Sequence, residues 1–203
     1  MLERITRRER SDLLIAWIAI SIAFSLIFIR GGVTLETFLV FLLISMVTVG
    51  IGFILHEMAH KFTAMRYGYW AEFRKDNLML LVAVAMAALV GVVFAAPGAT
   101  VIYGTYITRE QNGKISAAGP AVNLVLCAVF AVLSGAAGLL SIPLLSLIGM
   151  VGLQVNAMIA AFNMLPVSVL DGKKVLAWNP AVFAVLIVTA FGILLASYFT
   201  PLF

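Results

Sequence analysis

Long apolar segments are the feature that most restricts the folds open to this chain. A helix needs roughly 17 to 25 residues to cross a bilayer, and six apolar segments reach that range: 13–29, 37–62, 78–95, 115–133, 142–165 and 181–199. Charged residues make up only 11% of the 203 residues, whereas soluble domains carry about 25%. The sequence therefore predicts a single all-α polytopic membrane domain over 1–203, with about six transmembrane helices.

Basic residues beside these segments predict the orientation, because Lys and Arg in short loops mark the cytoplasmic side. This pattern predicts a cytoplasmic N-terminus, a retained first helix and a multi-pass protein of the cell membrane. The net charge of +4 could also indicate a nucleic-acid partner, but the basic residues lie beside hydrophobic segments, so we expect the lipid bilayer and no nucleic acid. They form four groups: Arg4, Arg7, Arg8 and Arg10; Lys61, Arg66, Arg74 and Lys75; Arg109 and Lys114; Lys173 and Lys174.

Both histidines of the chain lie in one pentapeptide, His56-Glu57-Met58-Ala59-His60, inside an apolar segment. Residues four apart share one face of a helix, so both imidazoles can bind one metal ion with Glu57 beside them. Ionisable groups at membrane depth are costly and indicate function. The motif predicts a zinc site near the cytoplasmic face.

A catalytic zinc usually has three protein ligands, so a third must lie elsewhere in the chain. Asp171 follows a long apolar helix and is predicted on the same side as the histidines, although Asp171-Gly172 is also a common turn dipeptide. Glu72 and Asp76 are alternatives. Cys127 is the only cysteine, which excludes a disulfide framework and a multi-thiolate zinc site.

Segment 78–107 has basic residues on both flanks, so it must enter and leave by the same face. It divides at Ala96-Pro97-Gly98, a turn signal, into an apolar half and a half rich in β-branched and aromatic residues. We predict a re-entrant helix followed by an extended return over 100–107. That return could line the site, with Tyr103 as a substrate-binding candidate, and add a strand to a substrate. A hairpin used only for packing is the alternative.

Three motifs together resemble the site-two protease family of intramembrane zinc metalloproteases. They are His56-Glu57-x-x-His60, Asn163-x-x-Pro166-x-x-x-Leu170-Asp171-Gly172, and Gly119-Pro120-x-x-Asn123. They cover a core of 38–175, and we expect no PDZ or other soluble domain. The resemblance implies that His56, His60 and Asp171 bind one Zn²⁺ per chain and that Glu57 is the catalytic carboxylate.

The resemblance also implies hydrolysis of a peptide bond within or near a transmembrane segment of another polypeptide. Asn163 and Asn123 are amides at membrane depth that could contact substrate or hydrogen-bond a neighbouring helix. A protein without catalytic activity that binds transmembrane helices or metal is the alternative. A metal carrier would show further ligands along a path, and the remaining spans carry few acidic residues.

Overall fold

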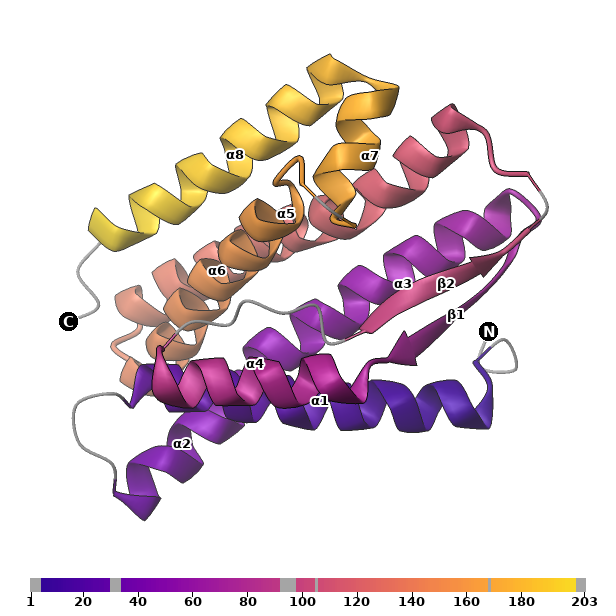
Figure 1. The fold of residues 1–203 in the computed structure, drawn as a ribbon. Coiled ribbons are helices and arrows are strands. Elements are labelled where there is room, and N and C mark those ends of the chain that lie inside the picture. Colours follow the sequence, from indigo (N-terminus) through magenta and orange to yellow (C-terminus); the bar gives the residue numbers. More distant parts are fainter. Residues whose placement is uncertain (1–4, 30–33, 92–97, 105, 168, 200–203) are drawn as a thin grey trace.

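Helices dominate the computed structural model, which describes residues 5–29, 34–91, 98–104, 106–167 and 169–199 (Figure 1). Within these residues, five helical stretches are long and apolar enough to cross a membrane. They are α1 (Arg7–Phe28), the continuous stretch Leu35–Arg66, α5 (Arg109–Leu139), α6 (Pro143–Asn163) and α8 (Pro180–Phe199). The predicted helical membrane protein is confirmed at this level.

The sixth predicted span, 78–95, is not confirmed. Its helical part is α4 (Asn77–Leu89), which has 13 residues. At 1.5 Å per residue such a helix is about 20 Å long, whereas the hydrocarbon core is about 30 Å thick. Ala96 and Pro97 of the predicted turn lie outside the described residues. The helix α4 is therefore too short to be a complete transmembrane crossing.

An antiparallel pair of strands accompanies α4. The extended return predicted over 100–107 is confirmed in part, since strand β2 covers Gly98–Tyr103 and ends before 104. Strand β2 pairs with β1 (Trp70–Lys75) from Trp70↔Tyr103 to Lys75↔Gly98. The sequence did not predict β1, because its charged residues resemble a solvated loop. Its apolar members Ala71 and Phe73 are nevertheless fully buried, and Phe73 packs edge-on against Phe53 of α3 (Ile51–Arg66). The small sheet thus lies against α3, the helix with both histidines (Figure 1).

The stretch Leu35–Arg66 is not a uniform α-helix. A π-helical turn, Met46–Gly50, separates α2 (Leu35–Ser45) from α3. The indole nitrogen of Trp17 donates to the Met46 carbonyl at 2.9 Å. A Cβ atom on Gly50 would lie 1.7 Å from that nitrogen, so the contact requires glycine. Helix α1 therefore packs directly against the π-turn that precedes α3, the helix with both histidines.

Helix α5 lies between the elements that carry the site, because it packs against α3, α6 and the short α7 (Asp171–Trp178). Glycines allow the close approach to α6: a Cβ on Gly149 would lie 2.6 Å from the Ser134 backbone nitrogen. The main apolar core joins α1, α3 and α6. Its buried members include Leu13, Ile20, Phe24, Phe53 and Val155.

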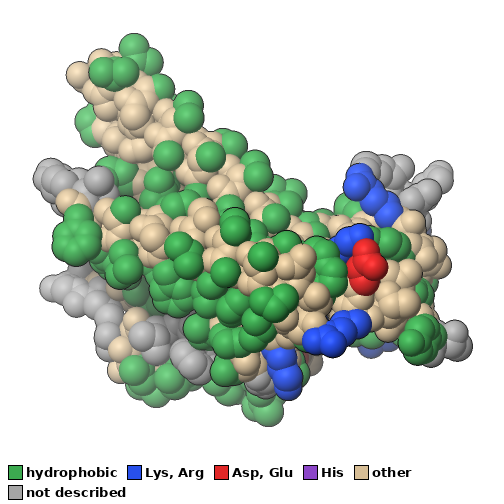
Figure 2. Space-filling view, turned by 90° about the horizontal axis from the view of Figure 1, so that it is seen from above, with side chains coloured by type: hydrophobic (Ala, Val, Ile, Leu, Met, Phe, Trp, Pro, Cys, Tyr) green, Lys and Arg blue, Asp and Glu red, His purple; other side chains and the backbone are tan. Residues whose placement is uncertain are grey.

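Charged side chains gather at one end of the molecule. The start of α1, the end of α3 and the start of α5 lie at the same end, on the right of Figure 1. Figure 2 shows Lys, Arg and acidic side chains at that end, while hydrophobic side chains cover much of the remaining face. This distribution suits a protein whose apolar part lies in a bilayer and whose charged end lies at the membrane surface.

Candidate metal centre

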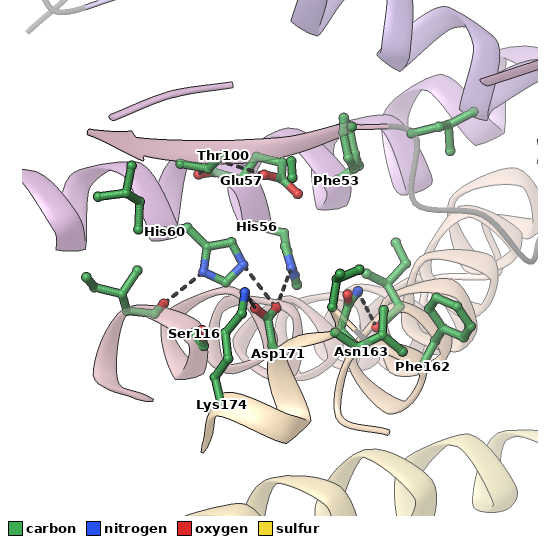
Figure 3. A pocket seen from close by; sticks show the side chains of 18 of the residues that line it. Phe53, His56, Glu57, His60, Thr100, Ser116, Phe162, Asn163, Asp171 and Lys174 are labelled. Atoms are coloured by element: carbon green, nitrogen blue, oxygen red, sulfur yellow. Dashed lines mark hydrogen bonds and ion pairs between the residues drawn. The ribbon is translucent and has the colours of Figure 1, made fainter. Parts of the chain in front are cut away.

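Two imidazoles and one carboxylate converge in the interior of the protein (Figure 3). The Nε2 atoms of His56 and His60 lie 3.4 Å and 3.1 Å from Asp171 Oδ2. One ligand atom from each of these residues lies within 4.8 Å of the others. All three residues are buried. Among the candidate third ligands, the fold therefore brings Asp171 to the histidines.

The other two candidates are engaged elsewhere. Glu72 lies on β1, where it binds Arg74. Asp76 caps α4 by accepting from the backbone N–H groups of Leu78 and Met79 at 2.9 Å and 3.0 Å. Because both carboxylates are used at the sheet and at the start of α4, neither competes with Asp171 for the histidines.

Asp171 reaches the histidines because the chain turns tightly after α6. Helix α6 ends at Asn163, Pro166 follows in the connection, and Asp171 is the first residue of α7. A Cβ atom on Gly172 would lie 2.1 Å from the Met164 carbonyl oxygen. The Asp-Gly pair is thus a helix start packed against the end of α6, and not a simple surface turn.

The hydrogen bonds of the two Nδ1 atoms orient the imidazole rings, so that the Nε2 atoms face Asp171. His60 Nδ1 lies 2.8 Å from the Ile115 carbonyl oxygen, and His56 Nδ1 lies 2.5 Å from Asn123 Oδ1. Both oxygens accept only, so each Nδ1 donates, and a metal ion bound at the site would take the lone pair of each Nε2. Two neutral imidazoles and a carboxylate form a donor set that zinc prefers.

Glycine on α5 leaves space at this donor set. A Cβ atom on Gly119 would lie 2.4 Å from His60 Nε2 and 2.6 Å from His56 Nε2. The space beside the two Nε2 atoms is therefore kept open by the absence of a side chain. Both the donor chemistry and this free space fit a bound metal ion.

Glu57 lies beside the cluster without joining it. Its side chain accepts a hydrogen bond from the Thr100 hydroxyl at 2.8 Å, and the same hydroxyl lies 3.1 Å from the Glu57 carbonyl oxygen. Figure 3 shows this pair between β2 and the histidines. The sequence predicts that the extended segment lines the site, but the contact of Thr100 with Glu57 follows only from the register of β2.

A cavity of about 260 Å³ contains the cluster. Lys174, noted in the sequence only as a charge, also lines it, with Nζ 3.8 Å from Asp171 Oδ1. Asn163 lines it and donates to the Ile159 carbonyl at 3.0 Å. Most of the other lining is apolar and comes from α1, α3, β2 and α6, with Ile20, Phe24, Phe53, Ile102, Met158, Ile159 and Phe162.

Two of the predicted substrate-binding residues lie elsewhere. Tyr103 is not among the residues that line the cavity, and it is 48% exposed. Alternation along β2 directs Thr100 and Ile102 to the cavity and Tyr103 to the other face. Asn123 is fully buried behind His56 and does not line the cavity. A substrate contact of Tyr103 or Asn123 therefore stays a prediction, whereas Asn163 lies in the cavity lining.

The fold and the site define a helical membrane protein with a buried His, His and carboxylate centre. The chain is 40% identical, over 198 residues that make up 97% of each chain, to a protein of Methanocaldococcus jannaschii named "Putative zinc metalloprotease MJ0611". The chain belongs to this family of zinc metalloproteases. No protein-family model and no solved structure matches the chain.

Proposed function

We propose that the protein is an intramembrane zinc metalloprotease of the site-two type, which hydrolyses a peptide bond within or near a transmembrane segment of another membrane protein. The observation that carries this proposal is the convergence of His56 and His60 on Asp171 inside an apolar cavity that Glu57 also lines. The family of the chain and its apolar helices support the same assignment.

One Zn²⁺ per chain would be held by His56, His60 and Asp171, the three residues whose ligand atoms converge. Zinc at such a site lowers the pKa of water to about 7 and polarises a carbonyl group. Three protein ligands leave no redundancy, so loss of any one of them weakens binding of the metal.

Glu57 is the proton carrier in this proposal. Its carboxylate lies in the cavity beside the histidines, where it accepts a proton from the attacking water and delivers that proton to the leaving amine. The Thr100 hydroxyl, which donates to Glu57 Oε2, holds the carboxylate in one orientation. Asn163, also in the cavity lining, has an amide that could donate to the oxyanion of the substrate.

The substrate would bind as an extended strand beside β2. In the described part of the chain β2 pairs with β1 alone, and its residues Gly98, Ala99, Thr100 and Ile102 line the cavity. An added strand would hold the substrate backbone open, because a hydrogen-bonded helix shields its carbonyl groups. The apolar lining favours large apolar side chains next to the cleaved bond.

We expect the site to lie toward the cytoplasmic face, and the basic residues near it support this orientation. Residues Lys173 and Lys174 follow Asp171 directly, and Lys61 follows His60. Cleavage is then expected in the cytoplasmic half of the substrate helix, and helix-breaking residues there should accelerate it.

The test uses the purified protein in detergent, assayed for zinc content and for cleavage of a transmembrane peptide. Glu57→Gln should keep zinc and lose cleavage, because it removes the proton acceptor and leaves the ligands in place. His56→Ala, His60→Ala and Asp171→Ala should each lose zinc. Cleavage by Glu57→Gln at the parent rate would exclude the proposed mechanism. A parent protein that binds zinc but cuts no peptide would favour the helix-binding alternative.

A further inference from the structure

Two buried asparagines lie behind His56, on the side of the ring that faces away from Asp171. Asn123 of α5 and Asn156 of α6 are both fully buried. Asn123 Nδ2 donates to Asn156 Oδ1 at 2.9 Å, and Asn123 Oδ1 lies 2.5 Å from His56 Nδ1. A buried amide is costly unless its donors and acceptors are paired. This pair therefore has a defined arrangement and is not a loose polar contact.

Backbone carbonyls set the direction of both amides. Asn156 Nδ2 donates to the Gly152 carbonyl at 2.8 Å, so Asn156 turns its oxygen toward Asn123. Asn123 Nδ2 faces that oxygen and also the Gly52 carbonyl at 3.3 Å, so Asn123 turns its own oxygen toward His56. Carbonyl oxygens accept only, and reversal of either amide would place acceptors against acceptors.

The tight fit of Asn156 against α3 fixes this arrangement further. A Cβ atom on Gly52 would lie 2.4 Å from Asn156 Oδ1. Only glycine at this position leaves space for the amide between α3 and α6. The backbones of α3 and α6 therefore fix the position of the Asn156 amide. The hydrogen bond from Asn123 to Asn156 then fixes the orientation of Asn123.

We propose that Asn156, acting through Asn123, is a positioning residue that keeps the proton of His56 on Nδ1 and the Nε2 lone pair toward the metal. This inference rests on the proposed zinc site and adds a residue one helix away from it. His60 is independent of the relay, because its Nδ1 donates to the Ile115 carbonyl. The structure thus gives each histidine its own orienting oxygen, and only that of His56 is a side chain.

The first measurement is zinc affinity by competition with a chelator. Loss of the partner that orients a metal-binding histidine weakens metal binding by about 10- to 100-fold. We expect a loss in that range for Asn123→Leu and a loss of about tenfold for Asn156→Leu. Gln154→Leu is the matched control, since Gln154 lies on the same helix but, among the described residues, the amide bonded to Asn123 is that of Asn156. The Gln154→Leu variant should bind zinc like the parent.

The second measurement separates positioning from a general loss of structure. The chain has only 2 histidines, so ¹⁵N-histidine labelling gives spectra of just two rings. In the zinc-loaded parent, both rings should carry their proton on Nδ1. In Asn156→Leu, the Nδ1 proton of His56 should lose its downfield shift, while that of His60 stays unchanged.

Two results would overturn the inference. One is a folded Asn156→Leu protein with parental zinc affinity and an unchanged His56 signal. The other is a zinc-loaded parent in which the His56 proton lies on Nε2, a result that needs no variant to fold. A parent protein that binds no zinc would instead contradict the proposed function itself.

Discussion

At the scale of single residues, the candidate metal centre depends on a missing side chain as much as on its ligands. Gly119 on α5 faces the Nε2 atoms of the two histidines on α3, and a Cβ atom there would approach both of them within 2.6 Å. Such contacts are far shorter than van der Waals separations of about 3.5 Å. An added methyl group would therefore displace α5 or turn the imidazoles.

Gly119→Ala should consequently lower zinc affinity by roughly tenfold or more, because the histidines can no longer keep their orientation. Gly135→Ala is the matched control: Gly135 lies on the same helix, and its Cβ would meet nothing within 4 Å. Chelator competition on both purified variants is the measurement. Equal zinc affinity of Gly119→Ala and the parent would show that α5 adjusts without cost.

Thr100 affects Glu57 and not the ligands. Thr100→Val keeps the shape of the side chain but removes the hydroxyl that donates to Glu57 at 2.8 Å. We expect peptide cleavage to slow by about tenfold, equivalent to about 1.4 kcal/mol in the barrier, with zinc content unchanged. Val101→Thr, on the opposite face of β2, should cleave at the parental rate. Parental cleavage by Thr100→Val would mean that Glu57 keeps its orientation without this contact.

The sequence alone predicts the candidate metal ligands and the candidate catalytic carboxylate. His56, Glu57 and His60 follow from a four-residue spacing on a helix, and Asp171 follows from its motif. Thr100, Lys174 and the relay through Asn156 could not be derived in this way. Their roles depend on strand register and on helix contacts between residues far apart in the chain. An isolated Thr or Asn carries no spacing signal in one sequence.

At the scale of elements, a buried ion pair attaches α1 to α3 and β1. Glu9 and Lys61 are both fully buried and bind each other. The other Glu9 oxygen accepts from the Phe73 backbone N–H at 3.0 Å. The Lys61 ammonium also lies 5.6 Å from the centre of the Trp70 ring. One carboxylate therefore joins the first helix to the strand that supports β2.

Lys61→Met should destabilise the protein strongly, because it leaves the buried carboxylate of Glu9 without its cation. Breaking a buried pair in this way costs about 3 to 5 kcal/mol. Lys114→Met is the matched control, since Lys114 pairs with the exposed Glu110, and such pairs contribute about 1 kcal/mol or less. Thermal unfolding in detergent compares the two. Similar melting temperatures for both variants would contradict a structural role for the buried pair.

The same elements show where sequence patterns were insufficient. The β-branched and aromatic residues predicted the strand β2. Strand β1 was not predicted, because its charged residues Glu72, Arg74 and Lys75 are typical of a solvated loop. Two of these charges are neutralised locally, since Arg74 contacts both Glu72 and Asp12. Strand pairing and ion pairs across elements are tertiary effects, and a single sequence does not display them.

At the scale of the whole molecule, the path of the chain between α3 and α5 distinguishes two topologies. If α4 and β2 form a re-entrant pair, the end of α3 and the start of α5 lie on the same side of the membrane. If the segment crosses once, they lie on opposite sides. The fold favours the re-entrant path, because β2 returns antiparallel to β1 and α4 is short.

Cysteine labelling in sealed vesicles tests this topology on a Cys127→Ala background, since Cys127 is the only native cysteine. Single cysteines replace the exposed residues Tyr67, Glu110 and Ser141, which lie after α3, at the start of α5 and between α5 and α6. Tyr67→Cys and Glu110→Cys should react with an impermeant reagent from one side, which the positive-inside rule makes the cytoplasmic side. Ser141→Cys should react only from the other side, because α5 crosses the membrane between them. Labelling of Tyr67→Cys and Glu110→Cys from opposite sides would exclude the re-entrant path.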